Sequence, residues 1–321
     1  MEIFNWGLIG PGRIAHQFAK ALNADFVGRL YAVASNNAQR SKDFSQQYQA
    51  QVSYHNYADL LADPKVDAVY IATPHNFHYE QIKQCLMANK AVLCEKPLTV
   101  NYEQAKELTE LAKNRNLFLM EAMWSLYLPI YQTVNNWIKS GAIGEVKLIH
   151  STFGFAVPRN ESDRLLNPDL AGGVLLDMGI YCVATAQWFS ASYPSKIQAS
   201  GLIGSTGVDE LTMVNLTYPD NKFAQFSCNF LTQTDNSLYI NGTKGRIKID
   251  DMFWAGTTAS LIVDDTTTRV TKPHAETGFE YEIAEAESCI KQKKLESSIV
   301  SHKETLQNMK IMETVLQQLK P

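Results

Sequence analysis

The first residue able to do chemistry is a lysine that directly follows a short apolar run. Apolar residues 91–94 lead into Glu95, Lys96 and Pro97, and helix-like sequence comes next. In an open parallel sheet such a run is a buried strand, and ligands bind just beyond the C-terminal ends of strands. Pro97 ends the strand because it has no N–H to donate, and the Lys96–Pro97 peptide bond can be cis or trans. Glu95 and Lys96 are therefore candidates for the site, against the alternative that Lys96 is a surface lysine.

A second candidate group is formed by Asp177 and Tyr181. The two residues are four apart, so on a helix they project from the same face. Asp177 stands in an apolar run, where a buried charge is costly unless it is hydrogen-bonded. The alternative is that Asp177 caps a backbone turn and Tyr181 is an ordinary half-buried aromatic residue. A nucleotide-binding motif upstream favours the functional interpretation.

That upstream motif is a glycine-rich turn at residue ten. A short apolar strand runs into Gly10-x-Gly12-x-x-Ala15, with Arg13 and Ile14 between, and a helix pattern follows. Gly10 permits a tight turn, and Gly12 lets the backbone approach a pyrophosphate. Ala15 is small enough for close packing of helix on strand, and the helix N-terminus offers N–H groups to phosphates. In this context the motif predicts a dinucleotide-binding site.

The end of the second predicted strand, residues 30–34, indicates which dinucleotide binds. An acidic residue there would bind the ribose 2′-hydroxyl of NAD, whereas a basic residue accommodates the 2′-phosphate of NADP. The sequence continues with Ser35 and Asn36, and no acidic residue appears before Asp43. Ser35 and Asn36 can donate hydrogen bonds to a phosphate, and Arg40 can pair with it. We therefore expect NADP in preference to NAD, with a solvated helix residue as the alternative for Arg40.

A further strand, residues 66–72, ends at Thr73 and Pro74, and His75 and His78 follow. Two nearby histidines can indicate a metal site, but no third or fourth ligand stands at a useful spacing. We therefore expect no metal. Thr73, Pro74 and the two histidines are interpreted as residues of the cofactor pocket or of the helix start.

The elements that position these residues fall into two patterns. Strands alternate with helices over residues 1–120, which predicts an α/β Rossmann domain with a doubly wound parallel sheet. Residues 121–321 predict a substrate-binding and dimerisation domain of α+β class with a large, open, mostly antiparallel sheet. One uncovered face of such a sheet is a natural surface for a homodimer. The elements expected in the second domain are helices at 130–138, from 172, at 280–291 and at 303–319, a strand at 146–153, and successive strands at 196–271.

Composition restricts the class of protein. The chain has 321 residues, 45% of them hydrophobic, and a formal net charge of −4. No basic stripe is present, which argues against nucleic acid as a partner. No apolar window approaches a membrane span, and the N-terminus lacks the pattern of a signal peptide. The five dispersed cysteines are typical of reduced thiols, so a cytoplasmic location is expected.

Taken together, these motifs resemble the Gfo/Idh/MocA oxidoreductase family over essentially the whole chain. Many members have histidine at the position of Tyr181. Tyrosine there, with the sequence 121–124, is similar to the branch of dimeric dihydrodiol dehydrogenase and NADP-dependent sugar dehydrogenases such as xylose dehydrogenase. That branch usually has an arginine two residues after Trp124, where this chain has Leu126. The matching motifs are Gly10-x-Gly12-x-x-Ala15, Thr73-Pro74 with His78, Glu95-Lys96-Pro97, and Gly172-Gly173 with Asp177-x-Gly179.

The resemblance implies an NAD(P)-dependent enzyme that moves a hydride between the nicotinamide and a secondary alcohol or carbonyl of a sugar, cyclitol or dihydrodiol. By matching position, Lys96 and Tyr181 are its catalytic pair, and Asp177, Trp124 and Phe153 line the substrate pocket. Tyr181 would act as acid/base, since a neighbouring ammonium favours the phenolate. Two alternatives stay open: a non-catalytic, dinucleotide-responsive regulatory protein, and a reductase of a non-sugar carbonyl.

Overall fold

The computed structural model describes residues 3–320 and divides into two compact units. The first unit comprises the chain up to Trp124 together with Ala275–Thr305, and the second comprises Ser125–His274 and the chain from Leu306 onward. The boundary predicted at residue 120 falls inside strand β6 (Leu119–Ala122). The segment Ala275–Thr305 clusters with the N-terminal residues, although it is far from them in sequence.

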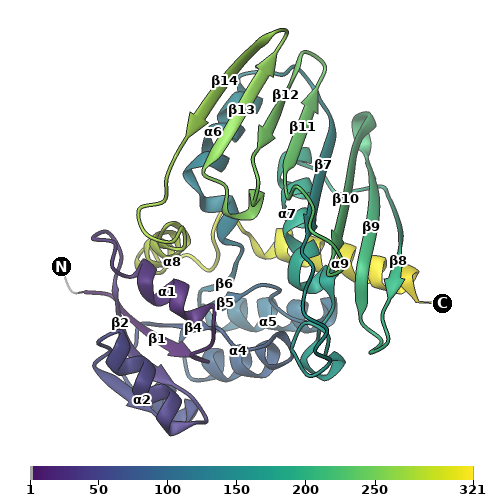
Figure 1. Ribbon diagram of the computed structural model, residues 1–321. Helices are drawn as coiled ribbons and strands as arrows, with labels where there is room; N and C mark the ends of the chain where they lie inside the picture. The colour runs from purple at the N-terminus through teal and green to yellow at the C-terminus, as the bar shows by residue number, and fades with distance from the viewer. Residues whose placement is uncertain (1–2, 321) are drawn as a thin grey trace. The chain divides into compact units, whose positions relative to one another are not determined.

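The first unit is built on a parallel sheet of six strands in the order β3-β2-β1-β4-β5-β6. Strands β1, β2, β4, β5 and β6 are labelled in Figure 1. The predicted doubly wound Rossmann architecture is thus confirmed. Between β1 and β4 the strand order reverses, and in such sheets ligands bind beyond the C-terminal ends of the strands at this point. The strands are β1 (Asn5–Ile9), β2 (Arg29–Ala34), β3 (Val52–Tyr54), β4 (Ala68–Ile71), β5 (Ala91–Glu95) and β6 (Leu119–Ala122).

Three helices of the first unit, α2, α3 and α5, begin at asparagine side chains that cap them. Asn37, Asn56 and Asn101 each accept a hydrogen bond from the N–H three residues on, which satisfies one of the free donors of the first helical turn. A 3₁₀ turn, His75–Phe77, precedes α4. The helices are α1 (Ala15–Ala21), α2 (Ala38–Gln47), α3 (Tyr57–Ala62), α4 (His78–Met87), α5 (Tyr102–Arg115) and α8 (Glu280–Lys291).

Helix α8 joins the first unit through a buried carboxylate. Glu287 accepts hydrogen bonds from the indole N–H of Trp6, at 3.0 Å, and from the backbone N–H of Gly28, at 2.6 Å. Trp6 lies beside Phe18 of α1, whose ring stacks on that of Tyr70 with 3.8 Å between centroids. These aromatic residues are buried, so β1, β4, α1 and α8 share one hydrophobic core.

The second unit contains a sheet of eight strands in the order β14-β13-β12-β11-β7-β10-β9-β8. Among these, β7 and β10 pair in parallel and the other neighbours are antiparallel, which confirms the predicted mostly antiparallel sheet. The strands are β7 (Val146–Gly154), β8 (Lys196–Ile203), β9 (Asp209–Tyr218), β10 (Lys222–Asn229), β11 (Leu238–Gly242), β12 (Gly245–Ile249), β13 (Thr258–Val263) and β14 (Thr266–Thr271).

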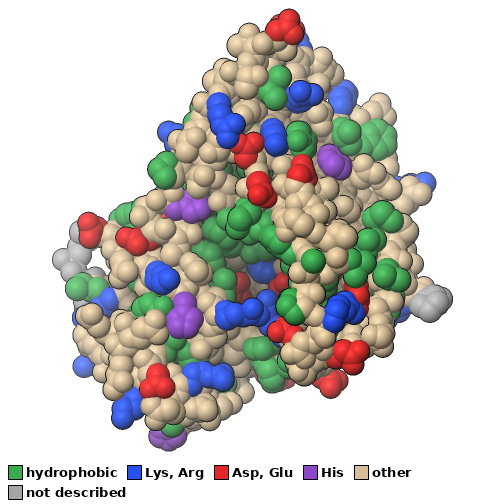
Figure 2. Space-filling view, in the orientation of Figure 1, with side chains coloured by type: hydrophobic (Ala, Val, Ile, Leu, Met, Phe, Trp, Pro, Cys, Tyr) green, Lys and Arg blue, Asp and Glu red, His purple; other side chains and the backbone are tan. Residues whose placement is uncertain are grey.

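One face of this sheet is covered by helices. Helix α7 (Ile180–Ser190) packs on β7 and β10, and α6 (Pro129–Lys139) packs on β13. Residues that alternate with the buried ones point to the other face. There Leu148, Met213 and Phe223 are 39%, 47% and 47% exposed, and Figure 2 shows hydrophobic side chains, in green, over strands β8 to β10.

The segment around Asp177 differs from the predicted helix. The sequence predicts a regular helix that starts near residue 172. The structure instead has a 3₁₀ turn at Pro168–Leu170, a π-helical turn at Leu175–Gly179, and then α7. Asp177 and Tyr181 therefore do not share one α-helix, because Asp177 lies in the π-helical turn. Such turns interrupt a helix at functional sites more often than elsewhere.

The sequence predicts no window near a membrane span, but Pro168–Ser190 has the length and hydropathy of one. Within it, 72% of the most apolar window is buried inside the fold, as in the core helix of a globular domain.

Candidate active site

The glycine-rich turn has the conformation that its sequence predicts. Gly10 has φ +84°, and a Cβ atom there would lie 2.5 Å from Cγ2 of Thr73. No side chain other than hydrogen fits at that position without displacing the end of β4. At Gly12, by contrast, a Cβ atom would meet nothing closer than the carbonyl oxygen of Ala72, at 3.9 Å. Space is therefore left beside Gly12 for a ligand to approach the backbone.

A pocket of about 590 Å³ lies beside this turn, within the first unit. Its walls come from the β1–α1 turn, the residues after β2, the end of β4 and helix α4. Thr73 donates its hydroxyl hydrogen bond to Gln81 at 2.6 Å, which fixes one wall. Of the predicted cofactor residues, the lining includes Gly10, Gly12, Ser35, Asn36, Arg40, Thr73 and Pro74; it does not include Arg13, Ile14, His75, His78, Glu95 or Lys96.

The polar side chains after β2 are arranged by α2. Asn37 caps this helix by accepting from the N–H of Arg40 at 3.0 Å, and the hydroxyl of Ser35 accepts from the N–H of Asn37 at 3.2 Å. Arg40 is exposed and also lines a neighbouring pocket of about 370 Å³, together with His16 and Gln39. A guanidinium, a hydroxyl and an amide thus stand together where the strand ends. They could hold a phosphate group.

The lysine at the end of β5 lies in a tight turn. The Lys96–Pro97 peptide bond is cis, and Lys96 is partly buried. His78 stands behind this turn, fully buried, with Nδ1 2.9 Å from the carbonyl oxygen of Pro97 and Nε2 2.9 Å from that of Thr73. Burial lowers the pKa of His78, and the two carbonyls oppose that shift. His78 therefore links the lysine turn to the pocket wall by way of Thr73.

In the second unit, Tyr181 belongs to an aromatic cluster. Its ring lies 5.8 Å from that of Phe153, which stacks on Trp254 at 3.6 Å and 8°. Phe155 meets the edge of Trp254 at 5.8 Å. The hydroxyl of Ser125 donates a short hydrogen bond to the carbonyl of Trp254 and holds this residue in place. Trp254 is not among the residues expected from the sequence, because it lies in a 3₁₀ turn within a region predicted as successive strands.

Asp177 is paired with an arginine from the preceding loop. Nη1 of Arg164 lies 3.0 Å from Oδ1 of Asp177, whose side chain is 13% exposed. Asp209 supports the π-helical turn that carries Asp177: its Oδ2 accepts from the N–H of Leu175 at 2.8 Å and from the hydroxyl of Thr212 at 2.9 Å. The carboxyl group of Asp177 is thus held at a defined position on the turn.

The structure brings some of the predicted residues together. Phe153 and Tyr181 are neighbours in the second unit. Trp124 belongs to the first unit, where its ring lies 4.7 Å from that of Phe279. Lys96 is also in the first unit, so the pairing of Lys96 with Tyr181 stays a prediction.

Three other features bear on the chemistry. Among residues 3–320, no group of three histidine, cysteine, aspartate or glutamate residues is arranged to hold a metal ion. All five cysteines are buried and unpaired. Leu126, at the position where the resembling branch has arginine, is buried in the second unit.

Two family models match the chain. Residues 4–123 match an oxidoreductase family with an NAD-binding Rossmann fold, Gfo/Idh/MocA, and residues 131–248 match the Gfo/Idh/MocA C-terminal domain. The chain is 34% identical to trans-1,2-dihydrobenzene-1,2-diol dehydrogenase of Xenopus laevis, over 98% of this chain and 97% of the relative. It is 35% identical to the Homo sapiens protein of the same name, over 78% and 76% of the two chains.

Similar solved structures extend over the whole chain. KijD10, a 3-ketoreductase from Actinomadura kijaniata in complex with NADP and TDP-benzene, has a TM-score of 0.87 and 25% identity, covering 99% of this chain and 98% of that one. An aldose–aldose oxidoreductase from Caulobacter crescentus, complexed with glycerol, has a TM-score of 0.90. It is 20% identical and covers 99% and 97% of the two chains, so this second likeness concerns the fold alone.

Proposed function

Because the chain belongs to the Gfo/Idh/MocA oxidoreductase family, we propose that it is an NADP-dependent dehydrogenase of cyclic diols. As an NAD(P)-dependent enzyme of this family it acts on CH–OH groups. The observation that carries the finer proposal is the pocket beside Gly10 and Gly12, which joins a glycine-lined backbone to Ser35, Asn36 and Arg40.

The preference for NADP rests on charge at the end of β2. Arg40 and Ser35 line the pocket there, and the first acidic residue after the strand is Asp43. A guanidinium pairs favourably with a 2′-phosphate, whereas NAD needs a carboxylate to accept from its 2′-hydroxyl. The open space beside Gly12 suits a pyrophosphate lying against the backbone. The NADP complex of KijD10, which has the same fold, supports the same choice.

The bound NADP supplies the nicotinamide that accepts or returns the hydride. In the proposed mechanism Tyr181 takes the proton of the substrate hydroxyl. The ordinary pKa of tyrosine is about 10, so its phenolate needs stabilisation near neutral pH. The ammonium of Lys96 provides that stabilisation and holds the reacting oxygen, and Asp177 orients a neighbouring hydroxyl.

For the substrate we propose a cyclic diol in preference to an open-chain sugar. The rings of Phe153, Phe155 and Trp254 gather beside Tyr181, and such a surface suits the apolar face of a ring. The proposal assigns Trp124 to the same substrate site. The names of the diol dehydrogenases that cover nearly the whole chain support this class.

We also propose which part of the chain binds the cofactor and which part binds the substrate. Residues 1–120 bind the cofactor, and residues 121–321 bind the substrate and form a homodimer. The dimer would use the uncovered face of the eight-stranded sheet, where Leu148, Met213 and Phe223 are exposed. Five buried, unpaired cysteines are consistent with the reducing cytoplasm.

The test is to follow NADPH formation with a panel of dihydrodiols, cyclitols and aldoses, for the wild type and Tyr181→Phe. Turnover of diols with NADP⁺ is expected, and the variant should lose at least about a hundredfold in kcat while binding NADPH normally. The substitution removes only the hydroxyl and keeps a ring beside Phe153, so packing is matched between the two proteins. If kcat and NADPH affinity fall equally, Tyr181 is not the acid/base. Tight NADPH binding without turnover of any compound would favour a regulatory protein.

A further inference from the structure

A buried carboxylate lies directly beside the turn that carries Lys96. Glu121, in β6, is 2% exposed. Its Oε1 accepts a hydrogen bond from the backbone N–H of Leu98 at 2.8 Å, and its Oε2 accepts one from the hydroxyl of Thr305 at 3.0 Å. Both carboxylate oxygens are thus bonded inside the first unit, and one of the two donors, Leu98, follows Lys96 by two residues.

The peptide group between Pro97 and Leu98 is held at both of its polar ends. Nδ1 of His78 lies 2.9 Å from the carbonyl oxygen of Pro97, and Glu121 accepts a hydrogen bond from the N–H of Leu98. A peptide group is planar, so it cannot rotate without breaking the bond to Glu121 and the contact with His78. Its orientation decides the direction in which the backbone leaves Lys96. The lysine therefore emerges from a turn whose geometry is set by two buried side chains.

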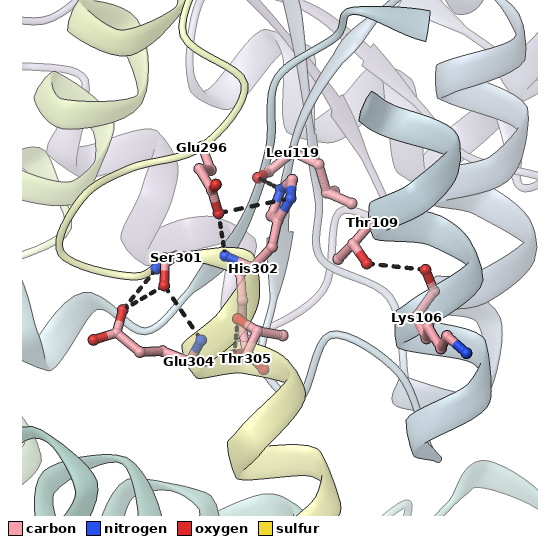
Figure 3. Close-up of polar contacts among 9 residues, drawn as sticks. Lys106, Thr109, Leu119, Glu296, Ser301, His302, Glu304 and Thr305 are labelled. Atoms are coloured by element: carbon pink, nitrogen blue, oxygen red, sulfur yellow. Dashed lines mark hydrogen bonds and ion pairs between the residues drawn. The ribbon is translucent and has the colours of Figure 1, made fainter. Parts of the chain in front are cut away.

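The second partner of Glu121 is itself fixed. Figure 3 shows the first turn of α9 (His302–Leu319), which carries Thr305. Ser301 and Glu304 form a capping box: the N–H of Ser301 donates to the Glu304 carboxylate at 2.9 Å, and the N–H of Glu304 donates to the Ser301 hydroxyl at 3.3 Å. The ring of His302 lies with Nε2 2.9 Å from the carbonyl oxygen of Leu119 in β6. The start of α9 is thereby held beside β6, and Thr305 can reach Glu121.

The pKa of Glu121 is shifted chiefly by its burial. Burial raises its pKa to about 7; the ammonium of Lys96 and the two hydrogen bonds act in the opposite direction, and Glu95 adds to the rise. The thiol of Cys94, whose own pKa is raised by burial, also faces it. When protonated, Glu121 can still accept from Leu98 and can donate to Thr305, because a hydroxyl both donates and accepts. The connection therefore persists in both protonation states.

We propose that Glu121 is a positioning residue for Lys96, which holds the Pro97–Leu98 peptide against β6 and the start of α9. The proposal rests on the function proposed above, in which Lys96 acts on the reacting oxygen. Misplacement of a catalytic group by about 1 Å can lower turnover by about a hundredfold. Loss of this connection should therefore lower kcat and leave the binding of NADP nearly unchanged.

The experiment combines a structural readout with kinetics. Amide hydrogen exchange at Leu98 is measured by NMR on the full chain without ligand, and kcat and KM are measured with NADP⁺ and a turned-over diol. Glu121→Leu should speed exchange at Leu98, relative to Val92 in β5, by about tenfold or more, and lower kcat by about 10- to 100-fold. Glu121→Gln keeps an oxygen that accepts from Leu98 and an amide that donates to Thr305. This variant should therefore show nearly wild-type exchange at Leu98 and nearly wild-type kcat.

Two further variants serve as a control and as a second test of the connection through Glu121. Glu287→Gln changes another buried carboxylate of the same unit, which also accepts from a backbone N–H. It should lower stability without altering exchange at Leu98 or kcat. Thr305→Val removes one partner of Glu121 and should give an intermediate effect, which covers the case in which Glu121→Leu does not fold.

The variants of Lys96 and of Glu121 test the catalytic role of Lys96 and the positioning role of Glu121 separately. If Lys96→Met keeps wild-type turnover, the catalytic role of Lys96 is wrong, whatever happens at Leu98. If Lys96→Met abolishes turnover but Glu121→Leu and Thr305→Val leave both kcat and exchange at Leu98 at wild-type values, the positioning role of Glu121 is overturned.

Discussion

At the scale of single residues, the proposed preference for NADP over NAD rests on one exposed cation, Arg40. Arg40 stands on α2 next to the pocket, and its backbone N–H is bound by Asn37, so the side chain starts from a fixed point. Hydrogen bonds to charged groups contribute about 1.5–3 kcal/mol each. The guanidinium can supply such a bond to a 2′-phosphate and has no equivalent partner on NAD.

Arg40→Ala should therefore raise KM for NADP⁺ by about 10- to 100-fold and leave KM for NAD⁺ nearly unchanged. Lys42→Ala serves as the control, because Lys42 is an exposed cation of the same helix. The measurement is KM for NADP⁺ and for NAD⁺ by steady-state kinetics, with the wild type and both variants. Parallel changes for the two cofactors would show that Arg40 does not contact the 2′-phosphate.

A second residue, Glu282, affects stability. Its side chain is fully buried on α8, and neither carboxylate oxygen has a hydrogen-bond partner among residues 3–320. Burial raises its pKa well above the ordinary value, and the carboxylate of Glu95 adds to the rise. The folded protein thus retains a proton that the unfolded chain releases. The contribution of Glu282 to the free energy of unfolding is therefore complete below the ordinary pKa of glutamate. It decreases as the pH rises from that value toward the raised pKa of the folded protein.

Glu282→Gln should consequently stabilise the protein, and the gain should grow between pH 5 and pH 8 by up to about 1.4 kcal/mol per pH unit. The free energy of unfolding, from urea titrations at several pH values, measures this. Glu287→Gln is the matched control, since Glu287 is buried on the same helix but has three hydrogen-bond donors. A gain that does not depend on pH would mean that Glu282 is ionised in the folded state.

At the scale of elements, the π-helical turn Leu175–Gly179 is held from outside. Asp209 of β9 accepts from the N–H of Leu175, and the backbone at Gly173 passes so close that a Cβ atom would lie 2.3 Å from Oδ1 of Asp209. Gly173 also has φ +120°, which favours glycine. Gly173 is therefore required by the approach of β9 to this turn. Gly172 is required by the preceding loop instead, since a Cβ atom there would lie 2.7 Å from the carbonyl oxygen of Leu165 and 2.8 Å from that of Asn167.

Asp209→Ala should loosen the turn that carries Asp177. The buried N–H of Leu175 would lose its partner, at a cost of about 1–3 kcal/mol in the free energy of unfolding. The KM for the diol should rise, whereas the KM for NADP⁺ should not, because the pocket lies in the other unit. Thr212→Val removes only the second partner of Asp209 and should change substrate KM less. Equal effects of the two variants on substrate KM would contradict a role for the bond to Leu175.

At the scale of the whole molecule, helices α6 and α7 pack on one face of the eight-stranded sheet, and the other face presents exposed apolar residues. Leu148 and Phe223 are cross-strand partners on β7 and β10, and both are exposed. Adjacent exposed apolar residues on a broad, regular surface are favourable for association of two copies about a twofold axis.

Combining Leu148→Lys with Phe223→Lys should convert a dimer to monomers, because it places like charges in an apolar interface. Sedimentation velocity provides the measurement. Met87→Lys, which alters an exposed residue of α4 in the first unit, is the control. A wild type that sediments as a monomer, or a double variant that stays dimeric, would rule out this face as the dimer surface.

The sequence by itself determined the order and type of nearly all these elements. Alternation of apolar residues and helical periodicity are local properties, so the Rossmann sheet, the antiparallel sheet, and helices such as Glu280–Lys291 could be predicted. The cofactor turn was also predictable. Gly10 and Gly12 meet requirements that arise within a few residues of the chain or from the ligand itself.

Only the tertiary structure decided which distant segments join these motifs. Thr305 reaches Glu121 across 184 positions, and Trp254 stacks on Phe153 from a different part of the chain. The segment Ala275–Thr305 packs in the first unit, and a π-helical turn replaces the regular helix predicted around Asp177. Local sequence patterns do not predict such contacts, because the contacts depend on how elements far apart in sequence pack together. The neighbours of Lys96 and Asp177 are therefore properties of the fold.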